Sequence, residues 1–214
     1  MLLDPISNEW FTVLIMLCLV ILAIAKYLFS RRFNDFVRVI GNSKYLKIYA
    51  RDQKFIDQFD ALLFINLVIS FTIFLMLAYS TLVDELVFDI TLFVKLFLVI
   101  GVLLLIKVLL ERLIGSLFDI DELIDSYLFQ KTSYRNLIGL ILLPINIILI
   151  FSVPPTEVLI YIIISLLLLI NLIGFLTSFK SHQKLIIANF FYFILYLCAL
   201  EFAPYIILIE VFNK

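Results

Sequence analysis

Six long apolar segments separated by polar connections fill most of this 214-residue chain. A helix needs roughly 20 apolar residues to cross the hydrocarbon core of a bilayer, and most of the segments are about that long. None shows the residue-by-residue alternation of a membrane β-strand, so the backbone inside lipid is predicted to be helical. Hydrophobic residues make up 64% of the chain and charged residues 15%, which excludes a water-soluble domain of this size.

The predicted fold is all-α: a polytopic bundle of about six transmembrane helices that form a single membrane domain over residues 1–214. The predicted spans are residues 10–29, 61–79, 90–114, 137–153, 158–178 and 185–208. The fourth span is short and contains Pro144, which should kink it. Two amphipathic stretches in the connections, 30–40 and 119–130, are each predicted to form a short cytoplasmic interfacial helix.

The first amphipathic stretch places Phe33, Phe36 and Val37 at helical spacing, next to Arg31 and Arg32. This pattern is typical of a helix that lies on anionic lipid.

The second stretch is acidic, and Asp119 and Glu122 have the spacing of a helix capping box. Because the first connection is net basic, the two stretches could dock on each other; two independently solvated faces are the alternative. Asp119, Asp121 and Asp125 could also offer oxygen ligands to a cation, but the glycine and glutamate of an EF-hand loop are missing. A capped, solvated acidic helix is the favoured interpretation.

The Lys and Arg residues predict the orientation of the bundle. Fourteen of the 16 basic residues lie in or beside the connections that follow the first, third and fifth spans, and only Lys95 and Lys214 fall toward the other side. By the positive-inside rule these connections are cytoplasmic, so both termini are predicted to face outward.

Two charged residues inside the spans are candidate functional residues, because a charge in hydrocarbon is costly unless it is paired or hydrated. By the helical rise, Lys95 in the third span lies roughly 8 Å, and Glu201 in the sixth roughly 6 Å, below the outer surface. We therefore predict that Lys95 and Glu201 face each other. The alternative is that Lys95 snorkels outward and Glu201 reaches the interface beside Pro204.

A second polar cluster is predicted at the inner ends of the third and fourth spans. Its candidate members are Lys107, Glu111, Arg112, Tyr134, Arg135 and Asn136. Lys107 and Glu111 have the i, i+4 spacing of a helical ion pair. Alternatively, Arg112 and Arg135 serve as ordinary anchors on the inner side. Four asparagines are expected to make interhelical hydrogen bonds; they are Asn66, Asn146, Asn171 and Asn189.

No catalytic, cofactor or metal site is predicted. The only histidine, His182, lies in a short basic turn, so the chain lacks a histidine pair for zinc. A serine or cysteine nucleophile needs a base at its own depth, and His182 is predicted at the cytoplasmic boundary. Nucleic-acid binding is disfavoured, because the basic residues follow the topology and the formal net charge is −1.

Several longer motifs resemble a family of multi-pass inner-membrane proteins of the Bacteroidota that is catalogued as a domain of unknown function. The motifs are Glu111-Arg-Leu-Ile-Gly115, Phe118-Asp119, Tyr127-Leu-Phe129, Ser133-Tyr-Arg-Asn-Leu-Ile-Gly139 and the run from Phe191 to Tyr205. The resemblance implies a location in a Gram-negative inner membrane, where the outward termini would be periplasmic. It implies no reaction.

Two classes of function remain open. The first is a non-enzymatic membrane subunit or assembly factor of a cell-envelope complex, with the lipid bilayer and other membrane proteins as partners. The absence of catalytic constellations and the small external loops favour it. The second is a small transporter or lipid-handling protein that uses Lys95 and Glu201.

Overall fold

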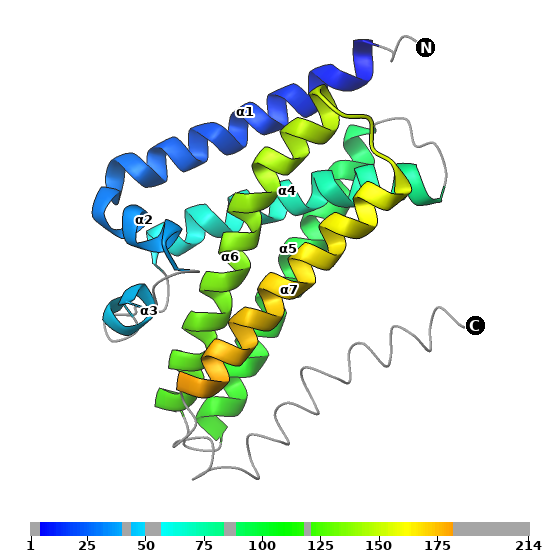
Figure 1. The fold of residues 1–214 in the computed structure, drawn as a ribbon. Helices are drawn as coiled ribbons and strands as arrows, with labels where there is room; N and C mark the ends of the chain where they lie inside the picture. Colours follow the sequence, from blue (N-terminus) through cyan, green and yellow to red (C-terminus); the bar gives the residue numbers. More distant parts are fainter. Residues whose placement is uncertain (1–4, 40–43, 50–56, 84–88, 118–120, 182–214) are drawn as a thin grey trace, which may run out of the picture.

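The computed structural model describes residues 5–39, 44–49, 57–83, 89–117 and 121–181 (Figure 1). These ranges contain helices and no strand, which confirms the predicted all-α class. The helices are α1 (Pro5–Leu28), α2 (Ser30–Val37), α3 (Lys44–Tyr49), α4 (Gln58–Leu82), α5 (Ile90–Leu117), α6 (Asp121–Phe151) and α7 (Glu157–Ser181).

Five of these helices contain segments that are long and apolar enough to cross a membrane. The segments are Glu9–Leu28, Gln58–Leu82, Ile90–Leu117, Ile124–Phe151 and Glu157–Thr177, and each overlaps one of the first five predicted spans. The sixth predicted span, residues 185–208, lies outside the described residues.

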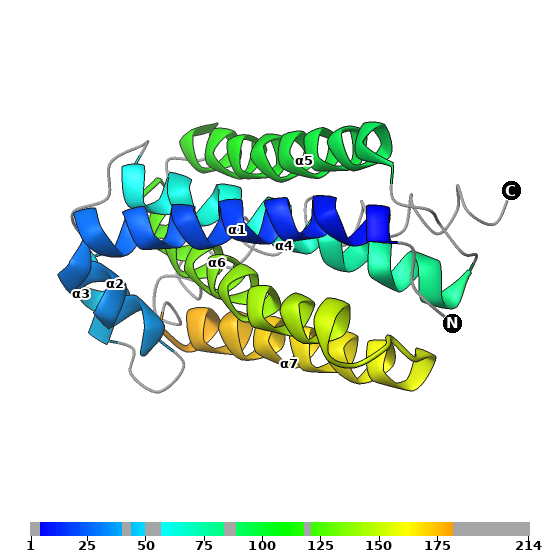
Figure 2. The same ribbon diagram turned by 90° about the horizontal axis from the view of Figure 1, so that it is seen from above.

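Helices α4 and α6 lie at the centre of the bundle. Seen from above, α5 and α7 lie on opposite sides, with α1, α4 and α6 between them (Figure 2). Burial follows this arrangement, because 67% of the apolar window of α4 is buried but only 6% of that of α5. Helix α5 is therefore the most peripheral of the five.

Among the described residues, three apolar clusters join the helices. One packs α1 against α4, α5 and α6 around Cys18, Ile73 and Phe93. Another joins α4, α6 and α7 around Leu142 and Ile160. The third lies where the first turns of α4 meet α2, α3 and the first half of α6. We call this region, together with the adjoining end of α5, the charged end of the bundle, because the ion pairs described below lie there.

Helices α4 and α6 approach most closely at Gly139. A Cβ atom added to Gly139 would lie 2.5 Å from Cα of Leu67, a backbone atom that cannot rotate away. The same addition at Gly101 on α5 would find its nearest neighbour, Cγ1 of Val68, at 3.8 Å. Of these two glycines, only Gly139 is required by close packing.

Helix α6 differs from the sequence-based prediction, because it begins at Asp121 instead of near residue 137. The acidic stretch 119–130 is therefore not a separate interfacial helix: its described part forms the first turns of α6, where Ile124, Tyr127 and Leu128 are buried. The helix also continues through Pro144, whose side chain is exposed. The proposed capping box lies outside the described side chains.

The first amphipathic stretch does form a helix, α2, but Phe36 does not face lipid. Its ring is fully buried and makes edge-to-face contacts with Tyr45 and Phe59 at centroid distances of 5.5 and 5.8 Å. Tyr45 in turn stacks on Phe129 of α6 at 5.7 Å. The two amphipathic stretches therefore belong to one apolar cluster, joined by aromatic rings instead of by opposite charges.

Candidate functional site

Arg32 of α2 is bound by side chains from two other helices. Its guanidinium donates to the carboxylates of Asp57 and Asp60 at the start of α4, with a distance of 3.0 Å to Asp60 Oδ2. It also donates to the Tyr45 hydroxyl of α3 at 3.4 Å. Asp57 has a second role, because its side chain caps α4 by accepting a hydrogen bond from the backbone N–H of Phe59. Arg32 thus ties α2 and α3 to the first turn of α4.

Aromatic rings form the walls around this guanidinium. The Arg32 Cζ atom lies 4.7 Å from the ring centroid of Phe59 and 5.2 Å from that of Tyr49, within the range of cation–π attraction. Burial by itself would lower the pKa of Arg32, but Tyr45 and Asp60 raise it, and the net shift is upward. Arg32 therefore stays charged, because its polar and carboxylate partners outweigh the effect of burial.

The two tyrosines beside Arg32 are held in the neutral form. Burial, followed by the negative charge of Asp60, raises the pKa of Tyr45. Burial and the charge of Asp35 raise that of Tyr49, whose hydroxyl donates to Asp35 at 3.2 Å. A neutral phenol retains the proton that it needs as a hydrogen-bond donor.

A second pair of charge contacts joins α5 to α6. Glu111 is fully buried, and its Oε1 accepts a hydrogen bond from Lys131 Nζ at 2.6 Å. One residue further along α5, Arg112 Nε donates to Asp125 Oδ1 at 2.7 Å. Because a buried charge is costly without a partner, these pairs fix the relative position of the two helices.

Two glycines near these ion pairs, Gly115 and Gly174, lie in close contacts between helices. A Cβ atom added to Gly115 on α5 would lie 3.0 Å from Cβ of Ile124 on α6. A Cβ atom added to Gly174 on α7 would lie 2.6 Å from the ring of Tyr134 on α6. The segments around Glu111 to Gly115 and Ser133 to Gly139 therefore take part in close contacts between helices.

Polar side chains also line the contact between α4 and α6. Asn146 Nδ2 donates to the backbone oxygen of Ser70 at 2.8 Å, which is one of the expected interhelical hydrogen bonds. Asn66 and Asn136 are fully buried, and their amide atoms have no hydrogen-bond partner among the described residues. Both lie within one turn of the contact between Leu67 and Gly139. Asn171, in contrast, is exposed.

The predicted site residues are only partly brought together. Glu111 and Arg112 form a cluster as expected, but their partners, Lys131 and Asp125, were not among the candidates. Tyr134 and Asn136 are buried nearby along α6, whereas Lys107 and Arg135 are half-buried. Lys95 is exposed on α5, while Glu201 and Asn189 lie outside the described residues. The pairing of Lys95 with Glu201 therefore stays a prediction.

Sequence reasoning missed the site around Arg32. A local signal for part of it exists, because Asp57 stands just before an apolar run, the position at which an aspartate caps a helix. The pairing itself joins residues 25 and 28 positions apart in the chain, beyond the reach of helical spacing. Among the described residues, no group of three or more His, Cys, Asp or Glu side chains could hold a metal ion.

The fold indicates the class of protein to which the chain belongs. A helical bundle with five apolar helices of membrane-crossing length is compatible with a multi-pass membrane protein. The chain belongs to the family described as "Domain of unknown function (DUF4271)", whose model matches residues 11–212. This match confirms the resemblance to a family of unknown function. No curated protein and no solved structure matches the chain.

Proposed function

We propose that this protein is a non-enzymatic subunit or assembly factor of a cell-envelope complex in a bacterial inner membrane. In this proposal the charged end of the bundle faces the cytoplasm and both termini are periplasmic. The basic residues between the first and second spans support this orientation by the positive-inside rule.

The subunit proposal rests on two observations: the charged residues pair with one another between helices, whereas α5 is little buried. The described ion pairs join helix to helix, α2 to α4 and α5 to α6, so these charges serve the scaffold. Helix α5 lies at one side of the bundle with 6% of its apolar window buried. Within the described part of the chain, a rigid bundle that leaves one long helix almost uncovered offers a surface on which a further transmembrane helix, of a partner or of the chain's own predicted sixth span, can pack.

Affinity purification of a tagged copy, expressed at its native level and extracted in mild detergent, tests this proposal. We expect a stoichiometric membrane-protein partner. A solitary monomer that carries bound lipid or substrate would refute the subunit proposal.

Two matched variants locate the contact. Val102 on α5 and Val20 on α1 are 50% and 52% exposed. Tryptophan at a lipid-facing position is tolerated, whereas at a helix contact its bulk prevents packing. We expect Val102→Trp to lose the partner and Val20→Trp to retain it.

One observation favours the alternative, a small transporter or lipid-handling protein. Lys95 is exposed inside the third span and has no ion-pair partner among the described residues, and such a charge is costly in lipid unless it is used or covered. In that case Lys95→Met and Glu201→Gln would each abolish function while the protein still folded. Full complementation of a deletion phenotype by both variants would exclude this use of the two residues.

A further inference from the structure

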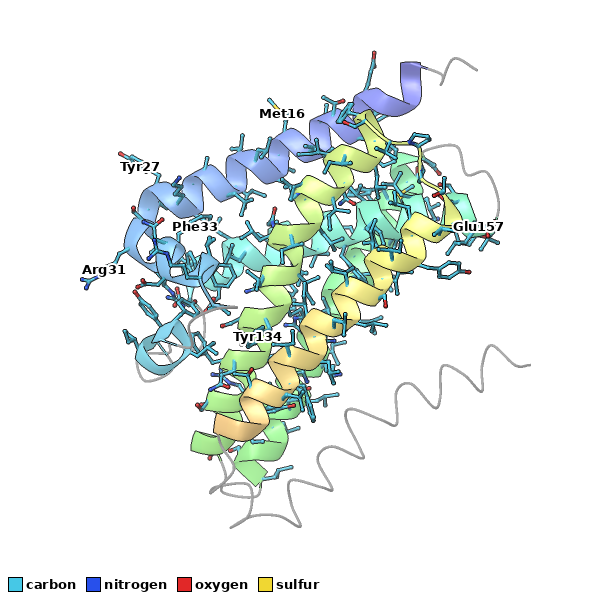
Figure 3. All side chains as sticks on the ribbon, in the orientation of Figure 1. Met16, Tyr27, Arg31, Phe33, Tyr134 and Glu157 are labelled. Carbon is cyan, nitrogen blue, oxygen red and sulfur yellow. The ribbon has the colours of Figure 1, made fainter. Side chains whose placement is uncertain are left out.

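Helix α2 presents a basic face on the outside of the bundle. Arg31, Asn34 and Arg38 have the helical spacing of one face, and all three are exposed. Lys26, in the last turn of α1, is also exposed. Figure 3 shows Tyr27 and Arg31 projecting outward from the corner between α1 and α2. We call Lys26, Arg31 and Arg38 the outer basic face.

The acidic residues near this corner point elsewhere. Asp57 and Asp60 are bound to Arg32 on the inner side of α2, and Asp35 accepts a hydrogen bond from Tyr49 of α3. None of the three basic side chains of the outer basic face has a carboxylate partner among the described residues. Arg32 on the inner side of α2 is thus paired with carboxylates, while Arg31 and Arg38 on its exposed side are in no ion pair among the described residues.

The short connection between α1 and α2 determines how deep the outer basic face lies in a membrane that α1 crosses. Only Phe29 separates the two helices, and its backbone continues the hydrogen bonding, donating to Ala25 at 3.0 Å and accepting from Phe33 at 2.8 Å. Because the apolar segment of α1 ends at Leu28, the basic face begins within one or two turns of the end of the span. That is the depth of the lipid headgroups, where basic residues are attracted to anionic lipids within a Debye length.

Apolar and aromatic groups beside the basic residues also suit a lipid surface. The Tyr27 ring is 86% exposed and Leu28 is 58% exposed. A nucleic-acid surface would leave these groups without an apolar partner, whereas a bilayer offers phosphates beside acyl chains. Phe36 and Arg32 hold the core-facing side of α2 against the bundle. The exposed side of α2 therefore has a fixed position.

We propose that the outer basic face binds the headgroup phosphates of anionic phospholipids. The proposal requires only that α1 crosses the bilayer; it is independent of the subunit proposal and holds for either orientation of the chain.

The test uses the full-length protein in mild detergent, with native mass spectrometry to count the bound molecules of added phosphatidylglycerol or phosphatidylethanolamine. The triple variant Lys26→Gln, Arg31→Gln, Arg38→Gln removes the charge. Its matched control, Lys26→Arg, Arg31→Lys, Arg38→Lys, keeps it.

We expect the wild-type protein and the charge-preserving variant to prefer phosphatidylglycerol, and high salt to weaken that preference. The neutral triple variant should bind phosphatidylglycerol on the order of 100-fold more weakly, because each basic residue near a headgroup contributes about fivefold. Equal binding of both lipids by the wild-type protein would overturn the proposal. So would an unchanged preference in the neutral triple variant, or a loss of a protein partner from the triple variant with lipid binding intact.

Discussion

Replacing Gly139 by alanine should destabilise the bundle, because the contact between α4 and α6 has no room for a side chain. The added Cβ atom would lie 2.5 Å from Cα and 2.7 Å from Cβ of Leu67. Carbon atoms in contact are about 3.5–4.0 Å apart, so the helices would have to separate by roughly 1 Å. Leu67 cannot relieve the clash by rotation, because one of the atoms is in its backbone.

Two opposing effects determine how much Gly139→Ala changes the free energy of unfolding. In a helix interior, alanine is about 1 kcal/mol more favourable than glycine. Overpacking of a well-packed contact costs about 1–3 kcal/mol, and a backbone clash lies at the upper end of that range. We therefore expect Gly139→Ala to lower the free energy of unfolding by about 2 kcal/mol.

Gly101→Ala is the matched control, since its nearest neighbour would be an ordinary van der Waals contact at 3.8 Å. It should be neutral or slightly stabilising. The free energy of unfolding of both variants can be measured by titrating the protein in mild detergent with a denaturing detergent and following helix content by circular dichroism. Equal stability of the two variants would refute the close approach of α4 and α6 at Gly139.

Three further predictions concern the charged end. Lys131→Met should destabilise the protein by about 3–5 kcal/mol, because it leaves Glu111 buried and unpaired, and adding Glu111→Leu should recover much of the loss in a double-mutant cycle. Asp57→Ala should cost about 1 kcal/mol more in thermal unfolding than Asp57→Asn, because asparagine still caps α4; equal losses would contradict the capping role. Burial and the charge of Asp35 raise the pKa of Tyr49 above its value of about 10 in the unfolded chain, so this contribution to stability is complete below that pH and is lost as the pH rises through the folded-state pKa. In an ultraviolet titration Tyr49→Phe should remove a high-pH phase, and its persistence would argue against this assignment.

Apolar run length and composition were sufficient to predict the helical class and the location of the five described spans. They failed at the start of α6 because the segment from Gln130 to Asn136 is polar, and polarity suggested a connection. Those residues include no proline or glycine, so nothing in the chain ends the helix there. Packing of α6 against α4, α5 and α7 buries several of these polar side chains, and a hydropathy pattern does not detect such tertiary burial.

The charged end shows a second limit of sequence reasoning. The i, i+4 spacing of Lys107 and Glu111 concerns α5 alone, and it gave no sign that Glu111 accepts a hydrogen bond from Lys131 on the neighbouring helix. Helical spacing detects neighbours on one helix, whereas pairs such as Arg32 with Asp57 depend on how separate helices cross. Position along the chain did place Glu111, Arg112, Tyr134 and Asn136 near one another at the meeting of two apolar segments, although their partners were not predicted.

The central claim, an oriented membrane bundle whose charged end is cytoplasmic, is tested most directly by labelling single cysteines in intact cells with a membrane-impermeant maleimide. In a background in which Cys18 and Cys198 are replaced by alanine, the exposed positions Asn34 on α2 and Ser152 after α6 would each be changed to cysteine. The account predicts that the cysteine at position 152 reacts once the outer membrane is opened, and that the one at position 34 reacts only after the inner membrane is permeabilised. The reverse pattern would contradict the orientation, and labelling of both positions from the same side would contradict the crossing of the membrane between them.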